Sequence, residues 1–367
     1  MFTKKNKSNN YKFFMDLALQ QAKKNLGNTK ENPSVGCVIT NKDHIISAGY
    51  TSISGRPHAE KNAISKSRTS VKNFELYSTL EPCSNFGKTP PCVNEIINNK
   101  ISKVYFSIND PDKRSFNMCK KKLKRKKIKV QSGILSKKVN NFYRSYFKFK
   151  KNDLPFVTSK IALSKDFFTI NKKKKWITNE FSRGRVHLIR ANHDCIISSA
   201  QTVLKDNPTL NCRIDGITNL SPTRIILDTY LKISLKSNIV KTSAIHPTII
   251  FYNKIDSKKI TKLKKYKIKS CRIPLSSKGN LNLKQCLLKA KKLGFSRILL
   301  ETGKKLFINF LRENLVDDLK IFISNTNLNS YGKNNVKKEL KLLLKNKKSC
   351  IEKVNLYGET LKSYMIK

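Results

Sequence analysis

Three candidate metal ligands place the tightest constraint on how this chain can fold. They are His58 and two cysteines that each follow a proline, Cys83 and Cys92. One histidine and two cysteines leave the fourth tetrahedral position of a zinc ion to water, which is the arrangement of a catalytic rather than a structural site. Any fold must bring these separate segments to one point. The sequence therefore predicts one zinc ion per chain, held by His58, Cys83 and Cys92.

Glu60 is the candidate catalytic residue, because it lies two residues after His58 without being needed as a ligand. Zinc lowers the pKa of its water toward neutrality, and a nearby carboxylate can take that proton and deliver it to a ring nitrogen and a leaving amine. Zinc deaminases show His-x-Glu followed by Pro-Cys-x-x-Cys. Here eight residues, 84–91, separate the cysteines. Either half of the pattern alone is usually structural, but their ordered combination predicts a hydrolytic deaminase of a small pyrimidine.

The charge of the chain admits two interpretations. There are 76 Lys and Arg residues against 24 Asp and Glu, a formal net charge of +52. Basic proteins gain affinity for nucleic acids and anionic membranes. Lysine is enriched along the whole chain, however, and even the run Lys120–Lys127 is typical of a solvated helix face. We expect no nucleic-acid or membrane partner and a small phosphorylated substrate, with a nucleic-acid-editing deaminase as the alternative.

Cysteine usage and hydropathy bear on the compartment. The nine cysteines are scattered, without the dense spacing that staples small secreted domains. No window approaches a membrane-spanning apolar run. These features predict a soluble, reduced, cytoplasmic protein.

Helix and strand patterns alternate along both halves of the chain, which is typical of layered α/β domains. In the first half we expect a helix at 11–26, one that begins near 58, one that begins near 91, and a separate basic helix that ends near 127. We expect strands at 36–40, 45–50, 76–80, 103–108 and 128–130. In the second half we expect strands at 156–162, 195–198, 224–228, 248–252, 297–301, 318–324 and 353–357, and helices at 179–190, 283–293 and 304–312. The predicted domains are a basic tail (1–10), a zinc deaminase (11–145), a linker (146–154) and a second domain (155–367).

The segment Thr79–Cys92 closely resembles the bifunctional riboflavin-biosynthesis deaminase/reductase family, as do Asn32–Ile39 and Pro57–Glu60. The longer gap between the cysteines is that family's own form. The second half resembles the family in order at Lys160–Asp166, Trp176–Thr178, Arg190–Ala191, Ile197–Leu210, Arg213, Arg224–Thr229 and Leu300–Gly303. The resemblance covers roughly residues 11–323.

The resemblance implies a fold and a pair of activities. The fold is α/β, a cytidine-deaminase-like three-layer domain followed by a dihydrofolate-reductase-like α/β domain. The first domain would deaminate a diaminopyrimidinone that carries ribose 5-phosphate. The second would reduce the ribosyl group to ribityl with NADPH. Members of the family are often oligomeric, so a homo-oligomer is compatible with the resemblance.

The resemblance also assigns roles to residues of the second domain. Contacts to NADPH are implied for Ala162, Trp176, Thr202, Asp206, Thr229 and Gly303. Contacts to the substrate are implied for Lys174, Arg190, Leu210, Arg213 and Glu301. Gly303, opening a helix after a strand, would leave backbone N–H groups free for a cofactor phosphate. Arg190 and Arg213 would offer forked donors to the substrate phosphate.

The chain departs from the family pattern at several positions in both halves. Phe167 stands where the family carries glycine, and Lys174 stands where serine is usual. Asn117 and Cys119 replace glycines, and a Leu-Leu-Gly step after the strand near Ile323 is missing. None of these touches the zinc ligands. They leave open a second alternative, a deaminase whose reductase half is inactive.

Overall fold

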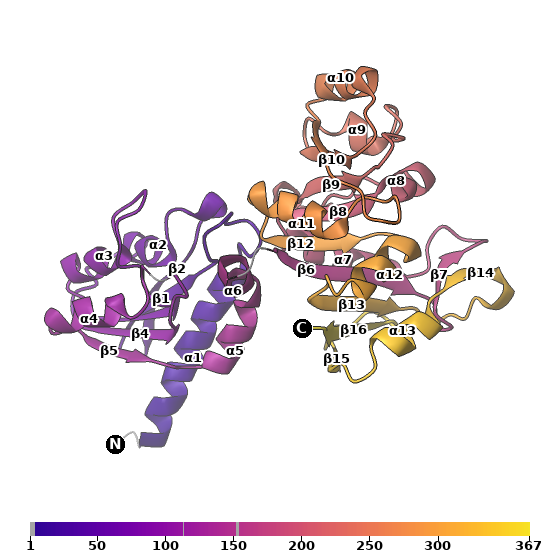
Figure 1. Ribbon diagram of the computed structural model, residues 1–367. Helices are drawn as coiled ribbons and strands as arrows, with labels where there is room; N and C mark the ends of the chain where they lie inside the picture. The colour runs from indigo at the N-terminus through magenta and orange to yellow at the C-terminus, as the bar shows by residue number, and fades with distance from the viewer. Residues whose placement is uncertain (1–3, 113, 152–153) are drawn as a thin grey trace. The chain divides into compact units, whose positions relative to one another are not determined.

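A computed structural model describes residues 4–112, 114–151 and 154–367 of the chain, which divides into two compact units, Met1–Asn152 and Asp153–Lys367 (Figure 1). Each unit is an α/β structure built on one main sheet. No helix in the described residues is long and apolar enough to cross a membrane.

The first unit is built on a five-stranded sheet in the order β2-β1-β3-β4-β5. The hairpin β1–β2 is antiparallel, as is the pairing of β1 with β3, while β3, β4 and β5 run parallel. The strands are β1 (Gly36–Asn41), β2 (His44–Tyr50), β3 (Glu75–Leu80), β4 (Lys103–Ile108) and β5 (Lys129–Ser132). The helices are α1 (Lys4–Lys23), α2 (Ala59–Ser65), α3 (Cys92–Asn98), α4 (Met118–Arg125), α5 (Ser136–Phe142) and α6 (Arg144–Lys151).

Two glycines of the β1–β2 hairpin let helices lie directly on the sheet. A Cβ atom at Gly36 would lie 1.9 Å from the backbone oxygen of Ala18 in α1, and one at Gly49 would lie 2.4 Å from that of Ala59 in α2. Side chains alternate between two cores along β1, with Val38 packing in the α1 cluster and Cys37 in the cluster of α2, α3 and α4. The unit is therefore a helix–sheet–helix sandwich, as predicted.

Both ends of this unit differ from the sequence expectation. Helix α1 begins at Lys4, so most of the segment expected as a basic tail is helical, and residues 1–3 lie outside the described part. The predicted linker is helical through Lys151, in α6. Aromatic side chains here belong to the core of the unit: Tyr143, just before the predicted linker, is buried, and Tyr146 within it donates a hydrogen bond of 3.0 Å to Asp110 Oδ1.

The second unit is built on a nine-stranded sheet in the order β11-β10-β9-β8-β12-β6-β13-β16-β15. Strands β11 to β13 in this order are parallel, and β16 and β15 add an antiparallel edge. The strands are β6 (Phe156–Leu163), β8 (Cys195–Ser199), β9 (Thr223–Leu227), β10 (Thr248–Tyr252), β11 (Lys269–Arg272), β12 (Arg297–Glu301), β13 (Asp318–Ile323), β15 (Ser349–Ile351) and β16 (Thr360–Met365).

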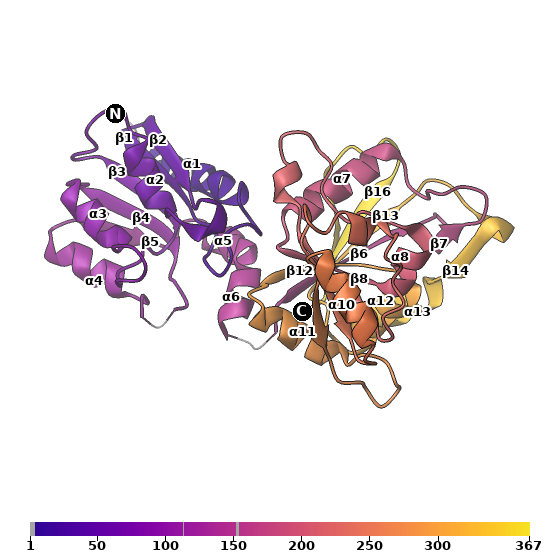
Figure 2. The ribbon, with the colours of Figure 1, turned by 90° about the horizontal axis from the view of Figure 1, so that it is seen from above.

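Helices cover both faces of this sheet (Figure 2). One face packs against α11 (Leu283–Lys292), α12 (Lys304–Arg312) and α13 (Lys337–Leu343). The other packs against α7 (Glu180–Ala191), α8 (Ala200–Asp206), α9 (Asn238–Lys241) and α10 (Ser257–Lys265). A separate two-stranded sheet joins β7 (Phe168–Asn171) to β14 (Gly332–Asn335).

The strand predicted at residues 353–357 is wrong. That segment is irregular, and the chain forms β15 before it and β16 after the turn at Tyr357 and Gly358. Apolar Val354 and Leu356 made it look like a strand, but they pack from a loop against the core on the α7 side of the sheet. Burial of apolar side chains does not require strand pairing, which is why the pattern misled.

Candidate functional site

A histidine and two cysteines meet beside the carboxyl end of β3. His58 Nδ1 lies 3.5 Å from Cys83 Sγ and 3.4 Å from Cys92 Sγ, and all three donor atoms lie within 4.8 Å of one another. Within the described residues this is the one His/Cys/Asp/Glu group with such spacing. Two sulfurs and an imidazole nitrogen are donors that zinc prefers, and three of them leave a tetrahedral position open. The residues fit a zinc ion at the positions that the sequence predicted.

The ends of secondary-structure elements place these ligands. His58 is the N-cap of α2, and Cys92 is the first residue of α3, directly after Pro91. Cys83 lies in the turn that follows β3, and its Sγ accepts the backbone N–H of Cys92 at 3.2 Å. A helix N-terminus and a donated N–H both stabilise a thiolate. Local sequence therefore prepares the cysteines for metal binding.

Protons are unevenly shared within the ligand group. The hydrogen bond from Cys92 lowers the pKa of the Cys83 thiol to about 4, against the opposing effect of burial. The same bond, together with burial, raises the pKa of Cys92, and the hydrogen bond to Cys83 raises the pKa of His58. A cation that binds such a group displaces the remaining proton, because thiolate and neutral imidazole are the ligating forms.

Glu60 points at the ligand group from the first turn of α2. Its side chain is buried, with Oε1 accepting a hydrogen bond of 3.1 Å from Ser78 Oγ, and Oε2 lying 3.4 Å from Cys92 Sγ. Burial raises the pKa of the Glu60 carboxyl, and the charge of Cys83 adds to this effect. A carboxyl whose pKa is moved toward neutrality is suited to accept and return a proton. Ser78 was missed by sequence analysis, because a serine inside a buried strand carries no pattern of its own.

A cavity of about 140 Å³ opens onto this group. His58, Glu60 and Cys83 contribute to its wall, and both basic and acidic side chains line the rest, among them Arg56 and Asp112. The cavity thus gives a small molecule access to the Glu60 carboxylate and to the ligand group.

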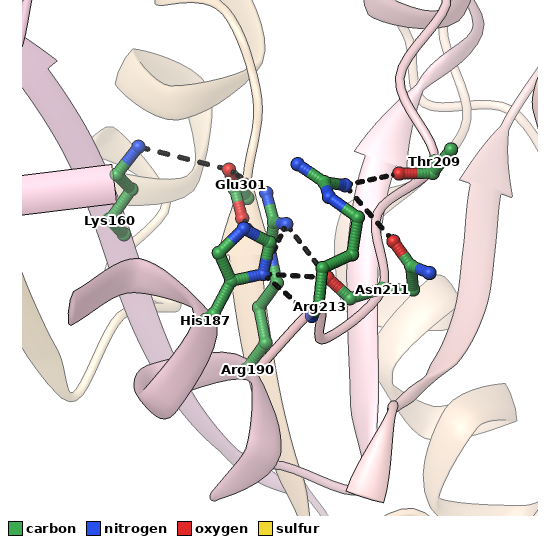
Figure 3. A network of polar contacts seen from close by, with 7 residues as sticks. All are labelled: Lys160, His187, Arg190, Thr209, Asn211, Arg213 and Glu301. Atoms are coloured by element: carbon green, nitrogen blue, oxygen red, sulfur yellow. Dashed lines mark hydrogen bonds and ion pairs between the residues drawn. The ribbon is translucent and has the colours of Figure 1, made fainter. Parts of the chain in front are cut away.

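A second polar group lies in the other unit, centred on the last residue of β12 (Figure 3). Arg190 of α7 makes two parallel bonds to the Glu301 carboxylate, Nε to Oε2 at 3.0 Å and Nη2 to Oε1 at 2.7 Å. Lys160 Nζ lies 3.8 Å from Glu301 Oε1. Burial acts to raise the pKa of Glu301, but the charges of Arg190 and Lys160 outweigh it and lower the pKa to about 2. Glu301 therefore stays ionised near neutral pH and is held in place by Arg190.

The loop before β9 brings two other predicted substrate residues, Leu210 and Arg213, to this group. The backbone oxygen of Asn211 accepts a bond of 2.9 Å from Arg190 Nη1, and its Oδ1 accepts one of 3.1 Å from Arg213 Nη1. Leu210 is buried, with a φ of 51°. The structure thus brings Arg190, Leu210, Arg213 and Glu301 together, and their contacts to a substrate stay predictions. Arg190 donates to Glu301 and Asn211, and the exposed Arg213 is the one of the two arginines that faces solvent.

Four of the six predicted cofactor residues lie at or just after the carboxyl ends of the parallel strands. Ala162 lies at the end of β6, Thr202 in the first turn of α8 after β8, Thr229 just after β9, and Gly303 at the start of α12. Ligands of parallel α/β sheets bind at the carboxyl ends of the strands. A Cβ atom at Gly303 would meet nothing within 4 Å, so space is open beside this helix N-terminus. The arrangement fits a dinucleotide phosphate.

The remaining predicted residues are exposed and make local contacts. The backbone N–H of Lys174 donates to Asn171 Oδ1 at 3.2 Å, and the Trp176 ring lies 5.1 Å from Arg183 Cζ. Asp206 ends α8. The contacts described for these three residues do not reach the Glu301 group, so their roles stay predictions.

Two members of the Glu301 group were not identified from sequence. Lys160 is a lone charged residue within an apolar strand, which is a usable signal. His187 lies three residues before Arg190 on α7, and burial together with the charges of Arg190 and Arg213 lowers its pKa to about 4. Its Nδ1 lies 3.1 Å from the Asn211 backbone oxygen, so it lines the same loop.

Comparisons with known proteins match both units. Residues 155–350 match the RibD C-terminal domain, and residues 8–108 match the cytidine and deoxycytidylate deaminase zinc-binding region. The riboflavin biosynthesis protein RibD of Aquifex aeolicus is 34% identical over 315 residues, which cover 85% of this chain and 86% of that protein. The chain belongs to the RibD family. RibD of Escherichia coli is 30% identical and covers 85% of this chain and 87% of its own length.

Solved RibD structures agree over nearly the whole chain. The deaminase/reductase of Thermotoga maritima superposes with a TM-score of 0.79 at 28% identity, over 98% of this chain and 99% of that one. RibD of Acinetobacter baumannii shares the fold with a TM-score of 0.83 at 24% identity, over 98% and 99%. The chain thus combines a zinc-binding deaminase domain with a RibD reductase domain. A nucleic-acid-editing deaminase, the alternative raised by the charge, would leave the second match unexplained.

Zinc content provides a direct check of the ligand group. We expect Cys92→Ala to lower bound zinc from about one ion per chain to near zero, because two ligands rarely hold zinc in a catalytic site. Cys119→Ala is the matched control: Cys119 is equally buried in the same unit but lies outside the ligand group. It should keep about one ion per chain, measured by mass spectrometry of the metal. Full zinc content in Cys92→Ala would contradict the assignment.

Acid should weaken the second unit through Glu301. The folded-state pKa of Glu301 is about 2, below its ordinary value of 4.5, so its contribution to stability is present above about pH 4.5 and is lost as the pH falls toward 2. At ~1.4 kcal/mol per pKa unit the contribution is about 3 kcal/mol. Urea unfolding of the wild type and of Glu301→Gln should therefore differ less at pH 3 than at pH 6. A difference independent of pH would contradict this prediction.

Proposed function

We propose that this RibD-family chain catalyses two successive steps. The first is hydrolytic deamination of 2,5-diamino-6-(5-phosphoribosylamino)pyrimidin-4-one, and the second is NADPH-dependent reduction of the ribosyl side chain to ribityl. The observation that carries the proposal is the buried Glu60 carboxylate directed at the His58, Cys83 and Cys92 group in an accessible cavity. The Thermotoga maritima neighbour, whose title names this deaminase and this reductase, supports the choice of substrate.

In the deaminase half the residues divide the work between binding and proton transfer. A zinc ion held by His58, Cys83 and Cys92 would supply Lewis acidity and an activated water. Glu60 accepts a proton from water and delivers protons to the ring nitrogen and the departing amine. Ser78 holds one oxygen of Glu60 and leaves the other directed at the ligand group. The net change replaces the amino group by oxygen from water and releases ammonia.

In the reductase half, residues of the Glu301 group hold the substrate next to the proposed NADPH site at the carboxyl ends of the strands. NADPH would supply the hydride that reduces the opened ribosyl unit. Glu301 is kept ionised and fixed by Arg190, which makes it a rigid acceptor for ribosyl hydroxyl groups. The exposed guanidinium of Arg213 is suited to bind the substrate phosphate. Ala162, Thr202, Thr229 and Gly303 would contact NADPH, and open space at Gly303 supports this.

The cellular setting is part of the proposal. All nine cysteines are free, and the zinc ligands must stay reduced, which favours a reducing compartment such as the cytoplasm. A small phosphorylated pyrimidine is the proposed partner, and a homo-oligomer stays a prediction.

A coupled assay tests both steps. Purified protein is given the diaminopyrimidinone ribosyl phosphate with and without NADPH, and ammonia release and nicotinamide absorbance are recorded separately. Ammonia release in both cases, followed by NADPH oxidation, is the expected result. Ammonia alone would establish the deaminase with an inactive reductase half, and no ammonia would refute the proposal. Replacing NADPH by NADH in the same assay decides the cofactor.

A further inference from the structure

Arg224 is an arginine sealed inside the second unit. It is the second residue of β9, its side chain is 0% exposed, and it faces the α7 side of the sheet together with Ile226. Arginine stays protonated in proteins, so a full positive charge is buried here. Burying a charge is costly unless it is well hydrogen-bonded, and an arginine retained at such a position therefore calls for an explanation.

The partners of this guanidinium are all neutral oxygens. Its hydrogen bonds to side chains go to Thr248 Oγ1, at 3.0 Å from Nε and 2.7 Å from Nη2, and to Thr242 Oγ1, at 2.9 Å from Nη1. Its bonds to backbone oxygens go to Thr209 at 2.9 Å, Ile239 at 2.9 Å and His246 at 2.7 Å. No carboxylate is among these partners, and burial lowers the pKa of Arg224 to about 10. The charge thus strengthens bonds to backbone rather than forming an ion pair.

One of these backbone oxygens belongs to the loop of the Glu301 group. Thr209 is followed by Leu210 and by Asn211, whose backbone oxygen accepts the bond from Arg190. Thr209 Oγ1 also accepts a bond from Arg213 (Figure 3). The loop therefore accepts hydrogen bonds from the buried Arg224 on one side and from Arg190 and Arg213 of the Glu301 group on the other.

The conformation of the loop needs such support. Leu210 lies between the two sets of bonds with a φ of 51°, in the left-handed region that a leucine seldom adopts. A residue held there costs about 1–3 kcal/mol and persists when its surroundings over-determine it. Asn211 Nδ2 also lies 3.1 Å from Nε2 of His246, whose backbone oxygen bonds Arg224, so a second path joins the arginine to the loop.

We infer that Arg224 is a positioning residue of the reductase site, which fixes the strained loop Thr209–Asn211 from beneath and so places Arg213 and Leu210 against the substrate. The inference rests on the proposed reductase function. A purely structural arginine would affect the stability of the unit alone. A positioning arginine also controls how well a folded enzyme binds and reduces the phosphorylated pyrimidine.

Steady-state kinetics of Arg224→Met test this inference, with Thr248→Val as the matched control. Both substitutions remove hydrogen bonds of the same buried network, but Thr248→Val keeps the bond from Arg224 to Thr209. Because misplacement of about 1 Å can cost ~10²-fold, we expect Arg224→Met to lose roughly that factor in reductase kcat/KM, largely through KM for the pyrimidine. The control should stay within about threefold of wild type, since its loop is still anchored. Ammonia release by the same samples should be unchanged.

A folded Arg224→Met with the kcat/KM of its control would overturn the inference. If Arg224→Met does not fold, Arg224→Lys decides in the same assay, because it keeps the charge but cannot span these acceptors. Hydrogen exchange of residues 207–213 adds a readout that is independent of activity, and it should be faster in the arginine variants than in Thr248→Val. A wild type that is inert with NADPH would refute the proposed function. In that case, equal hydrogen-exchange rates of residues 207–213 in the Arg224 variants and in Thr248→Val would overturn the role of Arg224.

Discussion

Glu60→Ala should release ammonia roughly 10²–10⁴-fold more slowly than the wild type while it keeps about one zinc ion per chain. The carboxylate is not among the three closely spaced ligand atoms, so its removal leaves the donor set intact. It is, however, the carboxylate that lies 3.4 Å from Cys92 Sγ with its other oxygen held by Ser78. Proton delivery should fail although the metal is bound. The measurement pairs an ammonia assay with metal analysis of the same sample.

Two controls separate catalysis from structure in this experiment. Glu60→Gln keeps the shape and the hydrogen-bond acceptor for Ser78, so it should fold like the wild type and be equally inactive. Reduction of the already deaminated product by the same chains reports on the second unit and should be unchanged. Loss of zinc in Glu60→Gln would show that Glu60 is structural, and retained deamination would remove it from the mechanism.

The zinc group was predictable because its chemistry restricts residue types and their order. Few residues can bind zinc, and a helix N-terminus or strand end must present each one, so His58, Cys83 and Cys92 were recognisable from sequence. The strands that support them were equally visible, since β3 and β4 are short runs rich in aliphatic and aromatic side chains. Local chemistry and local pattern agree in this part of the chain.

Other features depended on contacts that sequence does not reveal. The sequence predicts a linker at residues 146–154, but Tyr146 OH donates to Asp110 Oδ1 at 3.0 Å and its ring packs against the core of the first unit. Lys160 and His187 gained significance only when β6, α7 and β12 came together around Glu301. Partners distant in sequence decide such residues, and neither composition nor periodicity reports them.

Two of the departures from the family pattern, at Phe167 and Asn117, have a physical explanation. Phe167 adopts a φ of 71° and Asn117 one of 59°, so both occupy left-handed positions where the family carries glycine. Asparagine tolerates this conformation at little cost. Phenylalanine does not, but its ring packs against the core of the second unit, and its backbone oxygen accepts the N–H of Val336 at 3.0 Å. Packing and this hydrogen bond therefore offset the backbone strain at Phe167.

Arg190→Met and Arg213→Met should separate stability from substrate binding in the reductase unit. Arg190 is 8% exposed, and its removal leaves the Glu301 carboxylate, whose side chain is 16% exposed, with Lys160 at 3.8 Å as its remaining cation. Breaking a buried ion pair costs about 3–5 kcal/mol. Arg213 is exposed and bonds two neutral loop oxygens, so its loss should change the free energy of unfolding by about 0.5 kcal/mol or less. Urea unfolding of the two variants measures this difference.

Kinetics should show a different contrast, because Arg213 has donors left for a phosphate. Charge-assisted bonds contribute about 1.5–3 kcal/mol, so Arg213→Met should raise KM for the phosphorylated pyrimidine about 10–100-fold with KM for NADPH unchanged. Arg213→Lys should recover part of the loss, since lysine keeps the charge but not the fork. Arg190→Lys should not recover the reductase activity lost in Arg190→Met, because one ammonium group cannot reproduce the two parallel bonds to Glu301. Equal KM values for wild type and Arg213→Met would place the substrate phosphate elsewhere.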